Sequence, residues 1–187
     1  MDKMSLLTAT VVMMAMASPA RADVDQWQGF IAEAAQRFAI PEPWIRAVMK
    51  AESAGRTTLD GQPVTSKAGA MGLMQVMPNT YAEMQRKLNL GSDPYDPHDN
   101  ILAGTAYLRA MFDHYGYPGL FAAYNAGLGR YEQSLQGRSL PAETQAYLAS
   151  VAKVHPKPPS GHALFITLSA SPVTLFVPLT TVSGAGK

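Results

Sequence analysis

Residues Trp44 to Tyr81 decide the fold, and they read WIRAVMKAESAGRTTLDGQPVTSKAGAMGLMQVMPNTY. The stretch opens with apolar residues at helical spacing, namely Trp44, Ile45, Val48 and Met49. This spacing predicts a helix with one buried face, and continuing it places Glu52 on or beside that face. Glycine is common just past a helix end, so we expect the helix to stop at Ser53-Ala54-Gly55.

Glu52 is the candidate functional residue of this helix. A carboxylate beside a buried face loses hydration, and at the end of a helix it meets the negative pole of the helix dipole. Both effects raise its pKa and favour the protonated form. A solvated surface role is the ordinary alternative for a Glu in the last turn of a helix. If the side chain is sheltered, however, it has the property that a general acid needs near neutral pH.

A glycine-rich run, Ala68 to Pro78, follows and supports the functional interpretation of Glu52. Glycines allow the backbone to approach a ligand closely. Gln75 offers hydrogen-bond donors and acceptors, and the methionines offer soft apolar contact. Such a mixture suits a sugar, which has hydroxyls and amides to bind and apolar ring faces to cover.

Four segments stand in order along the chain: Glu52-Ser53, Ser66 to Pro78, Ala123 to Gly127, and Glu143 to Tyr147. Together they resemble the motifs of the soluble lytic transglycosylases, the lysozyme-like SLT-domain enzymes that cleave bacterial peptidoglycan. The resemblance runs from about Trp27 to Val154, and the short chain resembles the compact members that accompany secretion and conjugation machines. The chain departs from the family at Ala54-Gly55-Arg56, where an aromatic or apolar residue is usual. Thr57 to Thr65 resembles a local elaboration.

The resemblance implies a mechanism with one carboxyl group. Glu52 would protonate the bond between N-acetylmuramic acid and N-acetylglucosamine, and would then take the proton of the muramyl 6-hydroxyl as that oxygen attacks the anomeric carbon. The product would be a 1,6-anhydromuramyl end, formed without water. Most glycosidases use a second carboxylate. The other acids that could supply a second carboxylate are more simply explained as capping or surface residues: Asp60, Asp93, Asp96, Asp99 and Glu132.

The resemblance also assigns the residues around the acid. The positions that match substrate contacts are Ser66, Gln75, Met77, Tyr124, Asn125, Glu143 and Tyr147. Tyr124 could orient Glu52 or could pack in the core, and Glu143 could form the far wall of the site or could favour the first turn of a helix. Ser53 could serve the acid or be structural. Backbone conformation explains the remaining matches, which are Gly69, Gly72 and Gly127.

The fold class is mostly α, as a single lysozyme-like domain. Apolar periodicity and Gly or Pro punctuation predict helices ending before Pro41, over Trp44 to Glu52, over 79–88, from Asp96-Pro97 to Gly116, over 118–126 and over 141–154. A short hairpin is possible over 57–65 around Asp60-Gly61.

The chain divides into three parts. Residues 1–22 read as a signal peptide because an apolar stretch, Leu6 to Met16, precedes the small-x-small site Ala20-Arg21-Ala22. An N-terminal membrane helix is the alternative, but the apolar core is short for a span. Residues 23–155 form the catalytic domain. Residues 156–187 are a proline-rich linker and an apolar, strand-like or disordered tail, which could pack on the domain or pair with another protein.

Composition limits the other possibilities. Loss of residues 1–22 removes Lys3, Arg21 and Asp2 and leaves a formal charge of zero, which gives no support to nucleic-acid binding. The sequence has no cysteine, so disulfides and thiolate metal sites are excluded. Its four histidines (His98, His114, His155 and His162) lack ligand spacing, and we expect no metal and no cofactor. We expect a periplasmic monomer without a stable membrane span, which acts on a glycan strand.

Three functional readings follow. The first is a transglycosylase that opens the cell wall locally for an envelope-spanning secretion or conjugation apparatus. The second is a hydrolytic lysozyme-like or chitinase-like glycosidase. The third is a non-catalytic peptidoglycan-binding assembly protein. An intact Glu52 favours an enzyme over the third reading.

Overall fold

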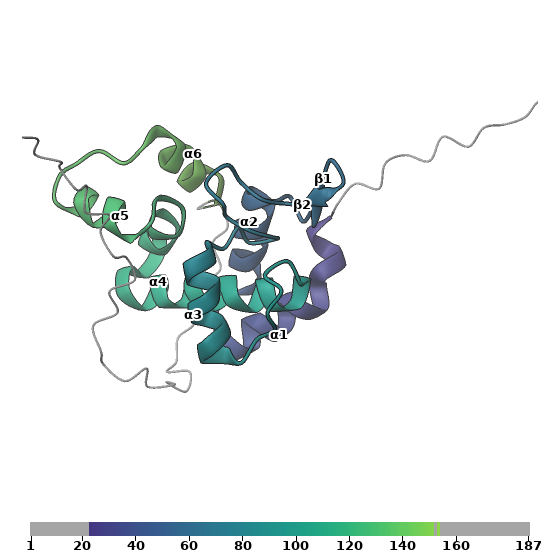
Figure 1. The fold of residues 1–187 in the computed structure, drawn as a ribbon. Helices are drawn as coiled ribbons and strands as arrows, with labels where there is room; N and C mark the ends of the chain where they lie inside the picture. The colour runs from purple at the N-terminus through teal and green to yellow at the C-terminus, as the bar shows by residue number, and fades with distance from the viewer. Residues whose placement is uncertain (1–22, 152, 154–187) are drawn as a thin grey trace, which may run out of the picture.

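The computed structural model describes residues 23–151 and 153. The described chain is mostly helical, as the sequence predicts, and carries one small hairpin (Figure 1). In chain order the elements are η1 (Val24–Trp27), α1 (Gln28–Phe38), α2 (Glu42–Glu52), β1 (Thr58–Leu59), β2 (Gln62–Pro63), α3 (Pro78–Leu88), α4 (Pro97–Ala126), α5 (Leu128–Leu135) and α6 (Ala142–Val151).

Local sequence signals explain where the helices begin and end. Prolines stand in the first turn of α2, α3 and α4, where a missing N–H costs nothing. Asp96 caps α4, because its carboxylate accepts a hydrogen bond from the Asp99 N–H at 3.0 Å. Ala39 and Asn89 end α1 and α3 in the left-handed conformation.

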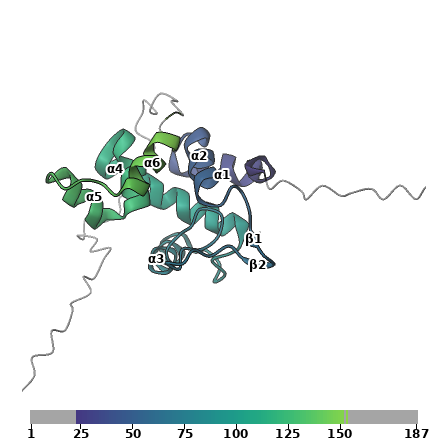
Figure 2. The same cartoon turned by 90° about the horizontal axis from the view of Figure 1, so that it is seen from above.

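Helix α4 is the centre of the domain. It contacts α1, α3, α5 and α6. Seen from above, α3 lies on one side of α4, and α1 and α2 lie on the other (Figure 2). The backbone of α4 leaves the helical region at Gly116 (φ 63°) and Tyr117 (φ −92°, ψ 138°). The expected helix end at Gly116 is therefore confirmed as an interruption between two helical parts.

An aromatic cluster anchors the helix that carries Glu52. The Trp44 ring of α2 is fully buried and stacks on Tyr117 with ring centroids 5.4 Å apart. Phe112 and Phe121 meet the same ring edge-on, at 5.5 and 5.7 Å. Ile45, Val48 and Met49 of α2 are also fully buried, so the predicted apolar face of this helix is confirmed. Burial of four such side chains fixes the axis of α2.

The hairpin also forms where it was predicted. Thr58 pairs with Pro63 and Leu59 with Gln62 in an antiparallel register. Asp60 (φ 52°) and Gly61 (φ 76°) occupy the turn, both in the left-handed region that a two-residue hairpin turn of this kind requires.

Two helices, α5 and α6, differ from the sequence-based prediction. Helix α5 was not predicted: Leu128, Tyr131 and Leu135 stand at helical spacing, but the helix is only eight residues long, and none of its residues is buried. The last helix, expected over 141–154, spans Ala142–Val151. The predicted signal peptide and the linker and tail over 156–187 lie outside the described residues. Among the residues that the structure does describe, no helix is both long and apolar enough for a membrane crossing.

Candidate active site

Glu52 is the last residue of α2, and its side chain is half-buried. Burial raises the pKa of Glu52 from 4.5 to about 7. The Tyr147 hydroxyl opposes this rise by favouring the ionised carboxylate, and the negative charge of Glu143 adds slightly to it. Burial therefore favours the protonated carboxylic acid and lets the side chain carry a proton near neutral pH.

Two tyrosines face this carboxyl group. Tyr147 comes from α6 and Tyr124 from the second part of α4, and the pKa of each is raised well above 10 by burial and by the charge of Glu52. The buried Tyr147 hydroxyl makes no hydrogen bond of good geometry within the described chain, and Glu52 is the acceptor that it faces. Glu143, one helical turn before Tyr147, is exposed. Helix α6, whose Glu143 and Tyr147 were expected to form the far wall of the site, therefore lies next to Glu52.

The Tyr124 hydroxyl, which could orient Glu52 according to the sequence, donates its proton elsewhere. The hydroxyl donates to the Met74 carbonyl oxygen at 2.8 Å. Its ring packs against Tyr107, with centroids 5.4 Å apart. The Tyr124 hydroxyl therefore donates its proton to the glycine-rich segment. Toward Glu52 or a ligand it can only act as an acceptor, through its oxygen lone pairs.

Ser53, the residue after the acid, is buried and structural. Its hydroxyl donates to the Leu73 carbonyl oxygen at 2.8 Å and accepts from the Gly55 N–H at 3.1 Å. Ser53 thus joins the end of α2 to the glycine-rich segment, and this joint fixes where the Glu52 side chain leaves the helix.

The glycine-rich segment, Ser66 to Pro78, folds as successive turns. Gly69 (φ 86°) and Gly72 (φ 72°) both use the left-handed region, as a backbone role requires. A Cβ on Gly72 would lie 2.5 Å from the side-chain nitrogen of Asn100, so a larger residue does not fit there. Gln75 is left-handed as well (φ 48°), which is uncommon for a residue with a side chain.

The predicted ligand-contacting residues of this segment are partly engaged in the fold. The Gln75 amide donates to the Gly72 carbonyl at 2.9 Å and to the Val64 carbonyl at 3.4 Å. The Ser66 hydroxyl accepts from the Ala70 N–H at 3.0 Å. Met77 is 41% exposed at the start of α3, which is high for a large apolar side chain. Asn125 is half-buried in the last turn of α4, and Gly127 (φ 80°) follows it.

Asn100 is a residue that sequence reasoning missed. It lies in the first turn of α4 and is fully buried. Its side chain accepts from the Met74 N–H at 2.8 Å and donates to the carbonyls of Met71 and Pro94, at 3.0 and 2.8 Å. A signal was present: Asn100, Gly104, Tyr107 and Met111 form a row at helical spacing. A polar residue on such a row indicates a buried hydrogen-bonding role.

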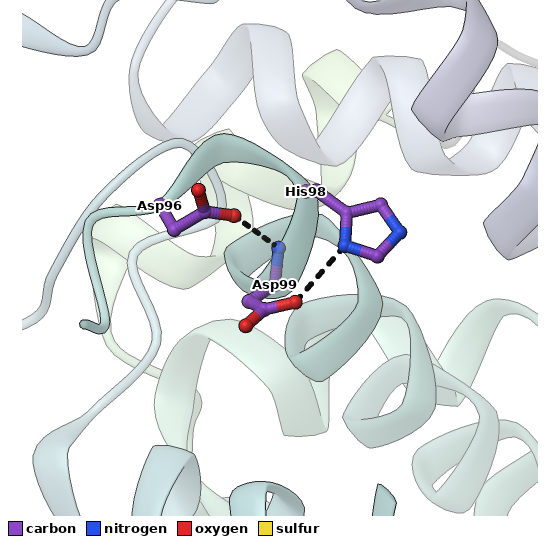
Figure 3. A group of neighbouring side chains, drawn as sticks. All are labelled: Asp96, His98 and Asp99. Atoms are coloured by element: carbon purple, nitrogen blue, oxygen red, sulfur yellow. Dashed lines mark hydrogen bonds and ion pairs between the residues drawn. The ribbon is translucent and has the colours of Figure 1, made fainter. Parts of the chain in front are cut away.

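Asp96, His98 and Asp99 are close enough together to be considered as a metal site. Figure 3 shows the Asp96 carboxylate directed at the Asp99 backbone and the Asp99 carboxylate directed at the His98 ring. Asp99 also accepts from the Gly91 N–H at 2.6 Å, and the other ring nitrogen of His98 meets Glu33 at 3.1 Å. Burial lowers the pKa of His98, but the hydrogen bonds to Asp99 and Glu33 outweigh it and raise the pKa. These contacts account for the closeness of the three side chains at the start of α4, where Asp96 is the N-cap.

Apart from Asn125, which follows Tyr124 at the end of α4, the predicted polar and apolar site residues fall into two sets. Glu52, Tyr124, Glu143 and Tyr147 interact with one another at the meeting point of α2, α4 and α6. Ser66, Gln75 and Met77 lie along the glycine-rich segment, which is joined to the first set through Ser53 and Tyr124. The remaining acids have structural partners or turn positions: Asp60 lies in the hairpin turn, the Asp93 side chain accepts from the Tyr95 N–H, and Glu132 accepts from the Tyr115 hydroxyl.

Comparison with known proteins gives a consistent result. The family model described as the transglycosylase SLT domain matches residues 29–145. The soluble lytic murein transglycosylase of Escherichia coli K12 is 34% identical over 119 residues, which cover 60% of this chain and 18% of that protein. The transglycosylase of Enterobacteria phage PRD1 is 32% identical over 128 residues, covering 68% of this chain and 42% of the phage protein.

Solved structures agree in fold. The 70 kDa soluble lytic transglycosylase of Escherichia coli superposes with a TM-score of 0.58 at 31% identity, over 67% of this chain and 22% of that one. An inactive mutant of the lytic transglycosylase Slt of Pseudomonas aeruginosa superposes with a TM-score of 0.57 at 30% identity, over 66% of this chain and 22% of that one. The match therefore covers less than half the length of each of these relatives, from 18% to 42%.

Proposed function

This chain belongs to the transglycosylase SLT domain family, and we propose that it is a lytic transglycosylase of peptidoglycan with Glu52 as its one catalytic carboxyl group. The observation that carries the proposal is the state of Glu52. It is half-buried between two tyrosines, and its pKa is raised to about 7, so it can hold a proton at the pH of the envelope.

In the first step, Glu52 donates its proton to the glycosidic oxygen between N-acetylmuramic acid and N-acetylglucosamine. The bond from the anomeric carbon to this oxygen breaks, and the N-acetylglucosamine part leaves as an alcohol. Positive charge develops on the muramyl ring, and the substrate's own N-acetyl group assists at the anomeric carbon. The carboxylate left on Glu52 is then stabilised by the Tyr147 hydroxyl, which favours the ionised form.

In the second step, the muramyl 6-hydroxyl oxygen attacks the anomeric carbon and gives its proton to the Glu52 carboxylate. The products are a 1,6-anhydromuramyl end and a regenerated acid, and no water is consumed. The nucleophile is held within the same sugar, which gives it a high effective concentration. This advantage explains how a site without a second carboxylate in the nucleophile position can act.

The other site residues would bind and orient the glycan strand. We assign Gln75, Met77 and Ser66 to one side, since they lie along the glycine-rich segment beside the acid. Tyr124 and Asn125 come from the end of α4, and Glu143 and Tyr147 come from α6. Met77 supports this assignment because its exposed side chain is available to a sugar ring face.

The names of the relatives also bear on location. Several are described as murein transglycosylases, which places their substrate in the cell envelope. We propose that residues 1–22 direct export to the periplasm, that 23–155 are the catalytic domain, and that 156–187 contribute to recruitment. A role beside a secretion or conjugation machine, as a monomer, is part of the same proposal and rests on the sequence resemblance.

Product analysis in labelled water tests this function. Purified peptidoglycan is digested in H₂¹⁸O, and the muropeptides are analysed by mass spectrometry. We expect anhydromuramyl ends, lighter than the reducing ends by one water, with no ¹⁸O incorporation. Reducing ends that carry ¹⁸O would instead show a hydrolytic lysozyme-like enzyme. Binding to the cell wall without any cleavage would show a glycan-binding assembly protein.

A further inference from the structure

The turn directly after Glu52 is an unusual piece of backbone. Ala54 (φ 55°) and Gly55 (φ 77°) are both left-handed, so the chain turns sharply within three residues of the acid. The Ala54-Gly55-Arg56 sequence brings no large apolar side chain to this turn. Within the turn, the Ser53 hydroxyl accepts from the Gly55 N–H at 3.1 Å, and the Arg56 side chain donates to the Ser53 carbonyl oxygen at 3.1 Å. Further support comes from elsewhere in the fold.

The N-terminal segment Asp23 to Trp27, called here the N-terminal clamp, supplies that support. The Gly55 carbonyl oxygen accepts hydrogen bonds from the Trp27 indole Nε1 at 2.9 Å and from the Gln26 side-chain amide at 3.2 Å. Both donors come from 28 or 29 residues earlier in the chain. The carbonyl of one turn residue thus ties two distant parts of the sequence together.

The packing at Gly55 is equally close. A Cβ on Gly55 would lie 2.9 Å from the Val24 backbone nitrogen and 3.1 Å from the Asp23 carbonyl carbon. Val24 itself is 8% exposed and belongs to the core. Backbone therefore packs directly on backbone, and only glycine allows the clamp to approach the turn this closely.

A second contact joins the clamp to the helix that carries the acid. The Arg46 guanidinium of α2 pairs with the Asp25 carboxylate at 2.5 Å. The Asp25 side chain is 76% exposed, so this ion pair adds little by itself. The Arg46–Asp25 pair does, however, attach the clamp to α2, in addition to its attachment to the turn at Gly55. Two points of attachment restrict the movement of the clamp relative to the turn.

We propose that the N-terminal clamp is a positioning device for the active site, with Trp27 as a positioning residue that acts on Glu52 through the Gly55 carbonyl. This inference rests on the proposed function of Glu52. On one side Ser53 holds the turn to the glycine-rich segment, and on the other side Trp27 and Gln26 hold it to the clamp. With both sides held, the Glu52 carboxyl group stays fixed relative to the bond that it protonates.

Loss of the clamp has two expected consequences. The turn gains freedom, and because catalysis is sensitive to small displacements of a reacting group, the rate falls. Water also reaches the Glu52 carboxyl group more easily, which favours its ionised form and lowers its pKa. Glycan binding depends mainly on other residues, so substrate affinity changes little.

The test is Trp27→Phe, which keeps an aromatic ring and removes the indole donor. Steady-state kinetics on soluble peptidoglycan fragments should show kcat lowered about tenfold with KM within about twofold. The alkaline limb of the pH profile should move to lower pH, and ¹³C NMR of the Glu52 carboxyl carbon in the free protein should show the same downward shift. Gln26→Met removes the weaker, exposed donor and should act in the same direction with a smaller effect.

The matched control is Phe30→Leu. Phe30 is 37% exposed and stacks on the Trp27 ring at 6.3 Å, but it does not contact Gly55 through a hydrogen bond. This variant should keep the parent kcat, pH profile and NMR titration. The proposal is overturned if Trp27→Phe and Gln26→Met leave the kcat and the Glu52 titration at parent values, even when the melting temperature falls. An inactive parent would reject the proposed function instead, whereas the NMR titration reports on the clamp without any activity.

Discussion

Replacing Glu52 by Gln is expected to reduce glycan cleavage by about 10³- to 10⁴-fold, the upper part of the range for loss of a general acid. Gln has the same shape as Glu, but it has no proton to give and no carboxylate to receive the one from the muramyl 6-hydroxyl. Both steps of the proposed reaction use this group, so both are lost together. Release of soluble muropeptides from purified cell walls measures the effect, and sedimentation with the walls should show that binding is retained.

The same substitution is expected to stabilise the fold at alkaline pH. Because the pKa of Glu52 is about 7 in the folded state and 4.5 as the reference value, burial of its charge destabilises the protein. Below pH 4.5 the group is protonated in both states and has no such effect. Stability is lost as the pH rises from 4.5 to 7, and the full loss is present above pH 7. Gln carries no charge and does not lose this stability. The free energy of unfolding of Glu52→Gln should therefore exceed that of the parent by about 2 kcal/mol at pH 8.

Glu132→Gln is the matched control for this prediction. Glu132 lies on α5, is exposed, and accepts from the Tyr115 hydroxyl, a role that Gln can also fill. It should keep the parent rate within about twofold and the parent stability within about 0.5 kcal/mol. Parent-like cleavage by Glu52→Gln would show that another group is the acid, and an unchanged stability at pH 8 would show that Glu52 is not held in a desolvating site.

Asn100→Leu is expected to cause the largest loss of stability among single changes near the site. The Asn100 side chain makes three hydrogen bonds to backbone groups of Met74, Met71 and Pro94, and it is fully buried. Leucine is similar in size but leaves these groups without partners, and each buried unsatisfied group costs about 1–3 kcal/mol. We expect the free energy of unfolding in urea to fall by roughly 3 kcal/mol or more.

This substitution should also lower activity at temperatures where the protein stays folded. Asn100 holds the glycine-rich segment, which carries Gln75 and Met77, against the start of α4. The control is Asn79→Leu, the same change at an exposed position in the first turn of α3, with an expected stability change within about 0.5 kcal/mol. A loss at Asn100 no greater than that at Asn79 would refute the anchoring role of Asn100.

Much of the fold could be predicted from the sequence because local signals agree with the final structure. The apolar spacing of Trp44, Ile45 and Val48 matches the buried face of α2. The Asp96-Pro97 start of α4 and the Asp60-Gly61 turn of the hairpin were likewise predicted, because capping and left-handed turns have strong residue preferences. Helix α5 was missed, since its apolar repeat of Leu128, Tyr131 and Leu135 spans only eight residues and is a weak signal beside its polar positions.

The site was harder to predict, because its contacts join residues far apart in sequence. Glu52 could be singled out from its place at the end of an apolar helical face. For Tyr124 the sequence left two roles open, orientation of the acid and packing in the core. Its hydroxyl proton goes to the Met74 carbonyl, and only the three-dimensional packing of α4 on the glycine-rich segment decides this. The Trp27 bond to Gly55 is likewise invisible in a one-dimensional pattern, since neither residue carries a motif.

The proposed reaction requires Glu52 to keep its proton near neutral pH. The pH dependence of kcat/KM on soluble peptidoglycan fragments tests this most directly, since it reports the ionisation of groups in the free enzyme. We predict a rate that falls about tenfold for each pH unit above a break near pH 7, because only the protonated acid can start the reaction. Tyr147→Phe should move this break to higher pH, since the hydroxyl that favours the carboxylate is gone. A parent rate that stays constant up to about pH 9, or that already falls above about pH 4.5, would contradict the account.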